Sequence, residues 1–205
     1  MNYLKVILVL PNYYFYYFLN IFFQSYQQKN IALNSTSLFH ALSTIILSFA
    51  SINYNLNSFY IFVNSGGYLV FDFIYILKKN KFDILRIMYL YHHFVVFLYI
   101  LLPQKQHYWK EVMFVAELSN IPNYLVYYSL KNDIKLGIKQ SNTTYILLKL
   151  QLLVYFILRI FFLGYYGLKE IYNDKVTYIK IHIYLVSILY LFGVIWFITM
   201  LKQNI

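Results

Sequence analysis

The sequence predicts an all-α membrane protein with about seven transmembrane helices. Of its 205 residues, 61% are hydrophobic and only 12% are charged, and the mean hydropathy is +0.56. A soluble globular domain carries about 25% charged residues, so this chain has too few charges to cover a water-facing surface. Its apolar residues are also grouped into stretches of roughly the 20 residues that a helix needs to cross a bilayer.

The apolar stretches follow one another along nearly the whole chain, and the connections between them are too short for a separate soluble domain. The fifth stretch is interrupted by AELSNIPNY (116–124). There, Pro122 lacks the N–H that would bond the carbonyl of Leu118, so we expect a kinked helix. The seven expected spans are residues 4–23, 34–53, 59–77, 86–102, 111–130, 145–166 and 181–201.

The net charge of +10 is interpreted as a topology signal. Lys and Arg lie mostly between the apolar stretches, and ten of them fall on one side of a seven-span arrangement against six on the other. The more basic side of a membrane protein faces the cytosol. The sequence therefore predicts a lumenal N-terminus and a cytosolic C-terminus, and the placement of the charges argues against nucleic acid as a partner.

Five of the expected spans carry ionisable side chains within their apolar stretches. Such groups are costly in a bilayer and usually face a protein interior or water, so five consecutive spans that carry them predict a shared polar interior. Counted from the span ends at about 1.5 Å per residue, these side chains fall into two separate layers. The cytosolic layer contains His40, Asp72, His92 and His93, and the lumenal layer contains Glu117 and Arg159.

Each layer has a structural and a chemical interpretation. Glu117 and Arg159 can form an ion pair that allows both charges to be buried. Asp72 can orient a nearby His that acts as a general acid or base, or the layer is a hydrogen-bonded structural cluster. Adjacent residues on a helix point about 100° apart, so His92 and His93 are not expected to face the same point.

Neither a metal site nor a cofactor is expected. The chain contains no Cys, which excludes thiolate ligands and disulfides. His ligands on one helix usually lie four residues apart, whereas His92 and His93 are adjacent.

Two of the expected spans carry polar side chains at helical spacing, which is typical of a cavity wall. Gly66 and Gly67 allow a neighbouring helix to approach one of them closely. One stripe comprises Ser65, Tyr68, Asp72 and Tyr75, and the other comprises Glu117, Asn120 and Tyr124. The residues expected to line a lipid-holding cavity are Tyr68, Asp72, Tyr89, His92, His93, Glu117, Asn120, Tyr124 and Arg159.

Five segments, in this order, resemble the TLC domain family of multi-pass membrane proteins. They are FHALST (39–44), GGYLVFDFIYIL (66–77), YHHFVVF (91–97), AELSNIPNYLVY (116–127) and LRIFFLGYY (158–166). The resemblance implies that spans two to seven form a six-helix barrel around a lipid-sized cavity, with the first span outside it. It divides the chain into residues 1–30, a first helix and cytosolic linker, and residues 31–205, the TLC domain. It also implies an endoplasmic-reticulum-type membrane.

The ceramide synthases of this family join an acyl-CoA to the amine of a sphingoid base, and their signature opens with a His pair. His92 and His93 match that opening. The His–Asp pair that follows in the synthases is replaced here by Ala116 and Glu117. The sequence is therefore more similar to the family members that are not ceramide synthases, which are linked to membrane lipid composition and trafficking.

The resulting expectation is a protein that holds a membrane lipid and influences lipid composition or trafficking. One alternative is an acyl-CoA-dependent N-acyltransferase, in which His92 or His93 is the general base and Asp72 or His40 orients it. Another alternative is a channel or transporter, which would need a polar path through the whole membrane.

Overall fold

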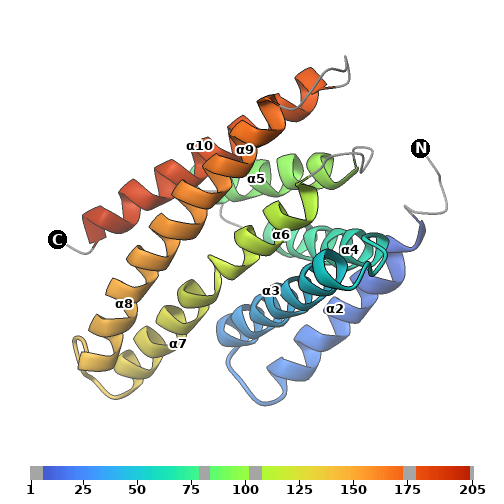
Figure 1. Cartoon of the computed structure of the whole chain (residues 1–205). Helices are drawn as coiled ribbons and strands as arrows, with labels where there is room; N and C mark the ends of the chain where they lie inside the picture. Colours follow the sequence, from blue (N-terminus) through green and yellow to red (C-terminus); the bar gives the residue numbers. More distant parts are fainter. Residues whose placement is uncertain (1–6, 79–83, 102–107, 173–178, 204–205) are drawn as a thin grey trace.

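Figure 1 shows a computed structural model that describes residues 7–78, 84–101, 108–172 and 179–203, and these residues are mostly helical. These residues contain no β-strand. The elements are α2 (Val9–Gln24), α3 (Lys29–Asn53), α4 (Phe59–Leu77), α5 (Ile84–Leu101), α6 (Trp109–Leu118), α7 (Ile121–Lys135), α8 (Asn142–Tyr155), the π-helix η1 (Phe156–Phe162), α9 (Leu163–Tyr172) and α10 (Ile179–Gln203). The predicted all-α class is confirmed.

Four helical segments of the described chain are long and apolar enough to cross a membrane. They are Lys29–Asn53, Phe59–Leu77, Asn142–Lys169 and Ile183–Lys202. The third of them runs through α8, η1 and most of α9 as one rod. Helix α5 is apolar over Arg86–Leu101 but shorter. The seven expected spans all contain helix, although residues 4–6 lie outside the described residues.

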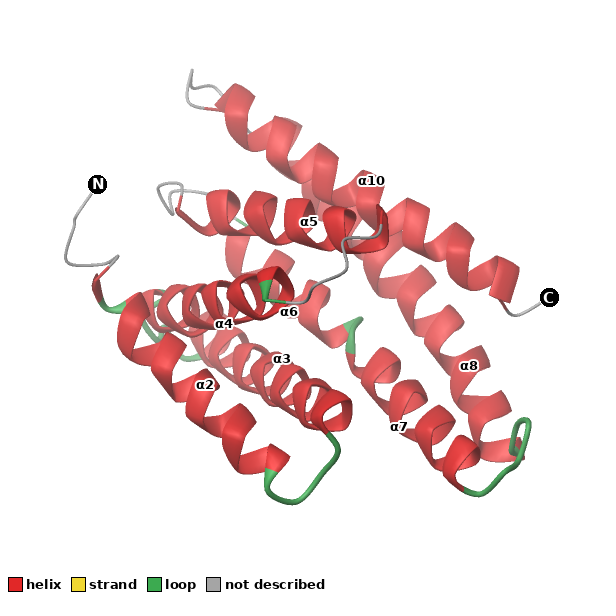
Figure 2. Ribbon diagram, turned by 180° about the vertical axis from the view of Figure 1, so that it is seen from behind, coloured by secondary structure: helices red, strands yellow, loops and turns green. Residues whose placement is uncertain are grey.

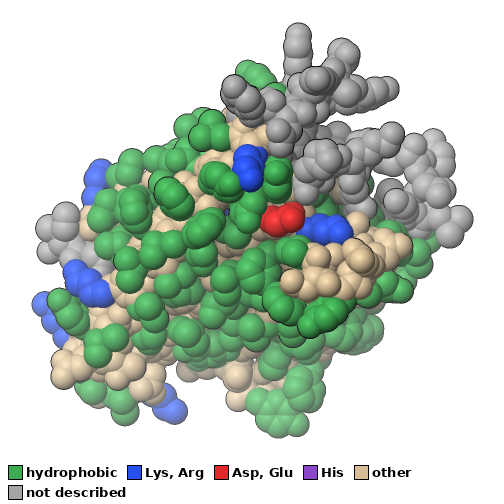
Figure 3. Space-filling view, viewed as in Figure 1, with side chains coloured by type: hydrophobic (Ala, Val, Ile, Leu, Met, Phe, Trp, Pro, Cys, Tyr) green, Lys and Arg blue, Asp and Glu red, His purple; other side chains and the backbone are tan. Residues whose placement is uncertain are grey.

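The outer surface is apolar, as a surface that faces lipid requires. Phe18 on α2, Ile46 on α3 and Phe161 on η1 each expose more than half of their surface, at 62%, 66% and 64%. Figure 3 shows hydrophobic side chains over most of one face of the molecule, with few charged side chains among them. Water-soluble proteins rarely expose contiguous apolar areas of this kind, so the surface supports a membrane-embedded chain.

The predicted kink at Pro122 is confirmed as a break between two helices. Helix α6 ends at Leu118, and α7 begins at Ile121 with Pro122 in its first turn. Pro is tolerated there because the first N–H groups of a helix have no intrahelical partner. The green segment between α6 and α7 in Figure 2 marks this interruption. Neither half is long enough by itself to cross a bilayer at about 1.5 Å per residue.

The rod formed by α8, η1 and α9 contains a distortion that the sequence did not predict. Residues Phe156–Phe162 form a π-helix, with Arg159 at its centre. Wider turns of this kind are rare and frequently lie at functional sites.

Small residues allow α3 to lie at the centre of the first half of the molecule. With one exception, His40, its buried side chains are Ala, Ser or Thr, which permit close helix approach; they are Ala32, Ser35, Thr36, Ser37, Ala41, Thr44, Ser48 and Ser51. Helices α2, α4, α6 and α7 all contact α3.

Helix α2 is firmly attached to this group rather than peripheral to it. Tyr16 on α2 is completely buried. A Cβ on Gly67 of α4 would lie 2.8 Å from the backbone carbonyl carbon of Asn12 on α2, so Gly67 lets the two backbones meet. Helix α3 begins at Lys29, and the predicted domain boundary at residue 30 therefore falls in its first turn.

The remaining helices follow one another in a closed order of contacts. Helix α4 contacts α3 and α5, α5 contacts α10, and α10 contacts η1 and α9. Both η1 and α9 contact α6, and α6 contacts α3, which closes the order. Helix α2 lies against α3 and α4 (Figure 2).

Candidate functional site

A cavity of about 110 Å³ lies among α3, α4, α5, α6, α7, η1, α9 and α10. Its lining includes both polar and apolar side chains. The polar side chains are His40, Tyr68, His92, His93, Tyr99, Glu117, Asn120, Tyr124 and Arg159. The apolar side chains are Leu69, Val96, Val112, Met113, Ala116, Leu163, Val186 and Leu189. The cavity is therefore amphipathic.

His93 is held by a carboxylate from the neighbouring helix. Its Nδ1 lies 3.2 Å from Oδ2 of Asp72, and both side chains are largely buried. Asp72 lies one turn beyond Tyr68 on α4 and does not itself line the cavity. The contact lacks hydrogen-bond geometry, so the Asp72 carboxylate acts on His93 as a nearby negative charge. A carboxylate close to a histidine can prepare it for general base catalysis.

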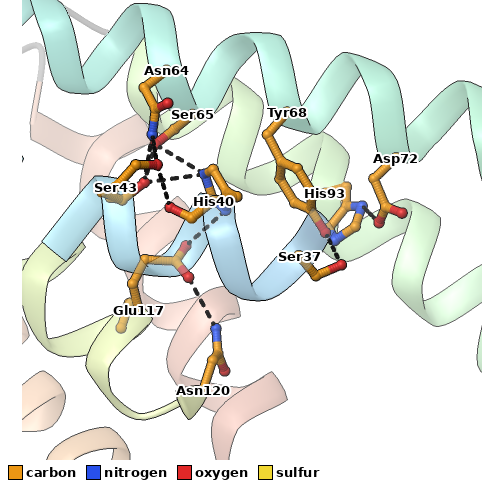
Figure 4. A network of polar contacts seen from close by, with 12 residues as sticks. Ser37, His40, Ser43, Asn64, Ser65, Tyr68, Asp72, His93, Glu117 and Asn120 are labelled. Atoms are coloured by element: carbon orange, nitrogen blue, oxygen red, sulfur yellow. Dashed lines mark hydrogen bonds and ion pairs between the residues drawn. The ribbon is translucent and has the colours of Figure 1, made fainter. Parts of the chain in front are cut away.

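His40 lies between a cluster of hydroxyl groups and Glu117, as Figure 4 shows. Its Nε2 is 3.2 Å from the Thr44 hydroxyl and 3.4 Å from the Ser65 hydroxyl. Its Nδ1 faces Oε1 of Glu117 at 4.0 Å. The His40 ring also stacks on Tyr68, with ring centroids 4.0 Å apart and planes inclined by 9°. His40 is thus fixed from three sides.

The predicted separation of the ionisable residues into two layers is wrong. Glu117, which was assigned to the lumenal layer, approaches His40 of the cytosolic layer, and Arg159 lines the same cavity. The depth estimate counted His40 from residue 34, the expected start of its span. Helix α3 begins at Lys29, so His40 lies eleven residues, or about 16 Å, from the start of its helix. The π-helix around Arg159 also changes the rise per residue.

The predicted ion pair between Glu117 and Arg159 is also absent: among the described residues, no carboxylate lies within 4.0 Å of the Arg159 guanidinium. Instead, Glu117 accepts a hydrogen bond from Nδ2 of Asn120 at 3.3 Å. Arg159 Nη1 donates to the carbonyl of Ala116 at 3.0 Å and to the Ser119 hydroxyl at 3.4 Å.

The two adjacent histidines have different neighbours, as their helical spacing predicts. His92 lies edge-on to Trp196 of α10, with ring centroids 4.9 Å apart, and also contacts Phe192. His93 faces Asp72 on α4. Both rings nevertheless border the cavity.

The structure brings together most of the residues that the sequence singled out for a cavity. Two expected lining residues are not among them. Asp72 contacts His93 but does not itself line the cavity, and Tyr89 is 46% exposed and contacts Trp196. Sequence reasoning did not include Tyr99, which is 1% exposed and lines the cavity. Its position seven residues after His92 places it on the same helical face, and that spacing could have identified it.

In the part of the chain that the structure describes, no group of three or more His, Asp or Glu side chains is arranged to hold a metal ion. No protein-family model, curated protein or solved structure matches this chain. The resemblance to the TLC domain family therefore stays a prediction, and function is argued from the cavity itself.

Proposed function

We propose that this chain is a multi-pass membrane protein of the TLC type that holds a lipid in its interior cavity and thereby influences membrane lipid composition or trafficking. In this proposal the protein resides in an endoplasmic-reticulum-type membrane with a lumenal N-terminus and a cytosolic C-terminus. Membrane lipid is the partner, and spans two to seven form the wall of a six-helix barrel.

The amphipathic lining of the cavity carries the proposal. Polar residues such as His40, His93 and Arg159 suit a head group, and apolar residues such as Val96 and Leu163 suit the first carbons of an acyl chain. At about 110 Å³, the cavity is smaller than the roughly 300–1,000 Å³ of ordinary ligand pockets. A head group and the start of a chain therefore fill it, and the rest of the chain lies outside the cavity.

The order of helix contacts supports the barrel. Neighbours run from α3 through α4, α5 and α10 to the η1–α9 segment and then through α6 back to α3. A closed order of this kind is required to enclose a cavity within a bilayer, because lipid would otherwise reach the polar lining.

A variant that fills the cavity tests lipid binding. Val96→Trp adds bulk to the cavity wall, and Phe94→Trp is its matched control because Phe94 lies on the same helix but is 50% exposed. Protein purified in mild detergent is analysed by native mass spectrometry, and the bound lipid is extracted and identified. We expect about one lipid per chain in the wild type and in Phe94→Trp, and little in Val96→Trp. Equal lipid in Val96→Trp, or none in the wild type, would contradict the proposal.

The contact between Asp72 and His93 favours a second candidate, an acyl-CoA-dependent N-acyltransferase. His93 would remove the proton from an amine as the amine attacks the thioester carbon, and the CoA thiolate would leave. Release of free CoA from protein in nanodiscs, with long-chain acyl-CoA and a panel of amines, measures this reaction.

In that assay, His93→Ala is expected to lower an acceptor-dependent rate by about 10²-fold or more, the usual contribution of a general base. Asp72→Asn should lower the rate less and shift its pH profile, because it leaves the base present but changes its environment. Tyr89→Phe, outside the cavity, serves as the control. No acceptor-dependent release from folded wild-type protein would exclude this candidate.

A further inference from the structure

We propose that Arg159 binds the carboxylate of a single-chain lipid, so that the ligand of the cavity is a fatty acid. This inference rests on the proposed lipid-holding function and specifies the chemistry of the head group.

The guanidinium of Arg159, which lines the cavity, has a buried donor without a partner in the described part of the chain. The side chain is 5% exposed, and its Nη1 is occupied by the Ala116 carbonyl and the Ser119 hydroxyl. Its Nε has no hydrogen-bond partner among the described residues. Nε and Nη2 form the edge of a guanidinium that binds a carboxylate through two parallel hydrogen bonds. In Arg159, the Nε of that edge has no hydrogen-bond partner among the described residues.

The charge of Arg159 also lacks a direct counter-ion in the described part of the chain. Glu117 lines the same cavity, but its carboxylate faces His40 Nδ1 and accepts a hydrogen bond from Asn120. An unpaired buried cation is strongly unfavourable, and within a bilayer such a residue usually marks a binding site. An anionic head group would supply the missing partner.

The surroundings of Arg159 are built to hold its stem and one nitrogen in place. Arg159 lies in the π-helix and reaches α6. At the end of α6, the Asn120 N–H bonds the Glu117 carbonyl and not the Ala116 carbonyl. The Ala116 carbonyl can therefore accept a hydrogen bond from Arg159. Across the rod, Gly193 of α10 makes room for the side chain: a Cβ there would lie 3.1 Å from Arg159 Cγ. The stem of Arg159 is thus packed, while its Nε has no hydrogen-bond partner among the described residues.

The size of the cavity selects the kind of anion. At about 110 Å³, it is smaller than the roughly 300–1,000 Å³ of ordinary ligand pockets. A carboxylate and the first carbons of one chain fit that space. A glycerophosphate group with its ester linkage is larger, so a fatty acid is favoured over a lysophospholipid.

The experiment compares ligands that differ only in the head group. Delipidated protein in detergent is titrated with a long-chain fatty acid, with the alcohol of equal chain length, and with a lysophosphatidic acid that carries the same chain. A charge-assisted hydrogen bond contributes about 1.5–3 kcal/mol, so we expect the wild type to bind the acid about tenfold or more tightly than the alcohol. The lysophosphatidic acid should bind more weakly than the fatty acid.

The variants assign that preference to Arg159. Arg159→Gln should bind acid and alcohol equally, and Arg159→Lys should keep a reduced preference because it has the charge without the planar fork. Lys135→Gln, which removes an exposed cation on α7, should behave as the wild type. The ligand comparison needs only wild-type protein, so it remains decisive if an Arg159 variant fails to fold.

Three outcomes would overturn the inference. Equal binding of acid and alcohol by the wild type would remove the role of the carboxylate while leaving lipid binding intact. An undiminished preference in folded Arg159→Gln would assign the anion to another residue. Tighter binding of lysophosphatidic acid would make the head group a phosphate. Binding of none of the ligands, together with no lipid in the purified protein, would instead reject the proposed function itself.

Discussion

The α2–α3–α4 interface and the cavity side of η1 and α10 both contain buried polar residues, but the hydrogen bonding of these residues differs. At the interface, the Tyr16 hydroxyl donates to Asn64 Oδ1 at 2.6 Å, and Asn64 Nδ2 donates to the Ser43 and Thr44 hydroxyls at 3.0 and 2.9 Å. On the cavity side, Nε of Arg159 has no hydrogen-bond partner among the described residues. The first group of residues connects helices to one another, whereas the second leaves a buried donor without a protein partner in the described part of the chain.

The difference shows that polarity inside a membrane protein does not by itself identify a site. Helices α2, α3 and α4 are regular, and the side chains of Tyr16, Ser43, Thr44 and Asn64 satisfy one another at close range, which stabilises packing. Around the cavity, the helices are distorted, as in the α6–α7 break and the π-helix, and donors remain unsatisfied. Distorted backbone combined with unsatisfied donors is the better marker of function.

The largest effect that this comparison predicts comes from two glycines. In Gly67→Ala, the new Cβ would lie 2.4 Å from Asn12 Cβ and 2.8 Å from the Asn12 backbone, which cannot yield without displacing α2. We expect the free energy of unfolding to fall by about 2–3 kcal/mol, measured by thermal unfolding in detergent.

Gly193→Ala is the matched change on the cavity side, where the Cβ would lie 3.1 Å from Cγ of Arg159, a contact that a shift of a few tenths of an ångström relieves. The helix propensity of Ala, about 1 kcal/mol better than that of Gly, should offset the contact and leave stability nearly unchanged. An equal decrease in the free energy of unfolding of the two variants would contradict the proposed difference between the two regions.

Replacing two asparagines, one in each region, should give a smaller change in stability and the same contrast between the regions. Asn64 makes three hydrogen bonds between helices. At about 0.6 kcal/mol for each interhelical hydrogen bond in a membrane, Asn64→Ala should lower the free energy of unfolding by about 2 kcal/mol. Asn120→Ala removes one bond, to Glu117, and should cost well under half as much. Chemical unfolding in mixed detergent measures both, and a larger loss in Asn120→Ala would reverse the assignment of structural and functional regions.

The smallest effect lies outside the spans, at the turn between α7 and α8. The Asp133 carboxylate accepts hydrogen bonds from the Thr144 hydroxyl at 2.6 Å and the Ser141 N–H at 3.0 Å, and these bonds lower the pKa of Asp133 below its usual 3.8. Because the folded state favours the ionised form, the stabilisation is fully present above about pH 4 and is lost as the pH falls through the lowered pKa. Thermal midpoints of the wild type and Asp133→Asn should therefore differ at pH 6 and converge near pH 2. A constant difference across that range would show that the carboxylate charge is not what stabilises the turn.

The chain alone determines the fold class and the inventory of interior groups. Apolar stretches of membrane length require helices, because a bilayer leaves no partner for unpaired backbone groups. Pro122 determines the break between α6 and α7, since it cannot donate an N–H. The same reasoning selected His40, His93 and Arg159, because a buried ionisable group in an apolar run must face the interior.

Tertiary structure decided which of those groups meet. The sequence paired Glu117 with Arg159, but in the folded protein Glu117 approaches His40 and leaves Arg159 without a carboxylate within 4.0 Å among the described residues. The π-helix from Phe156 to Phe162 carries no sequence signal that we recognised, and it determines where Arg159 lies. Hydrophobic periodicity reports which face of a helix is buried. It does not report the helix rotations and distortions that bring two particular side chains within hydrogen-bonding distance, because these depend on packing against helices far away in the sequence.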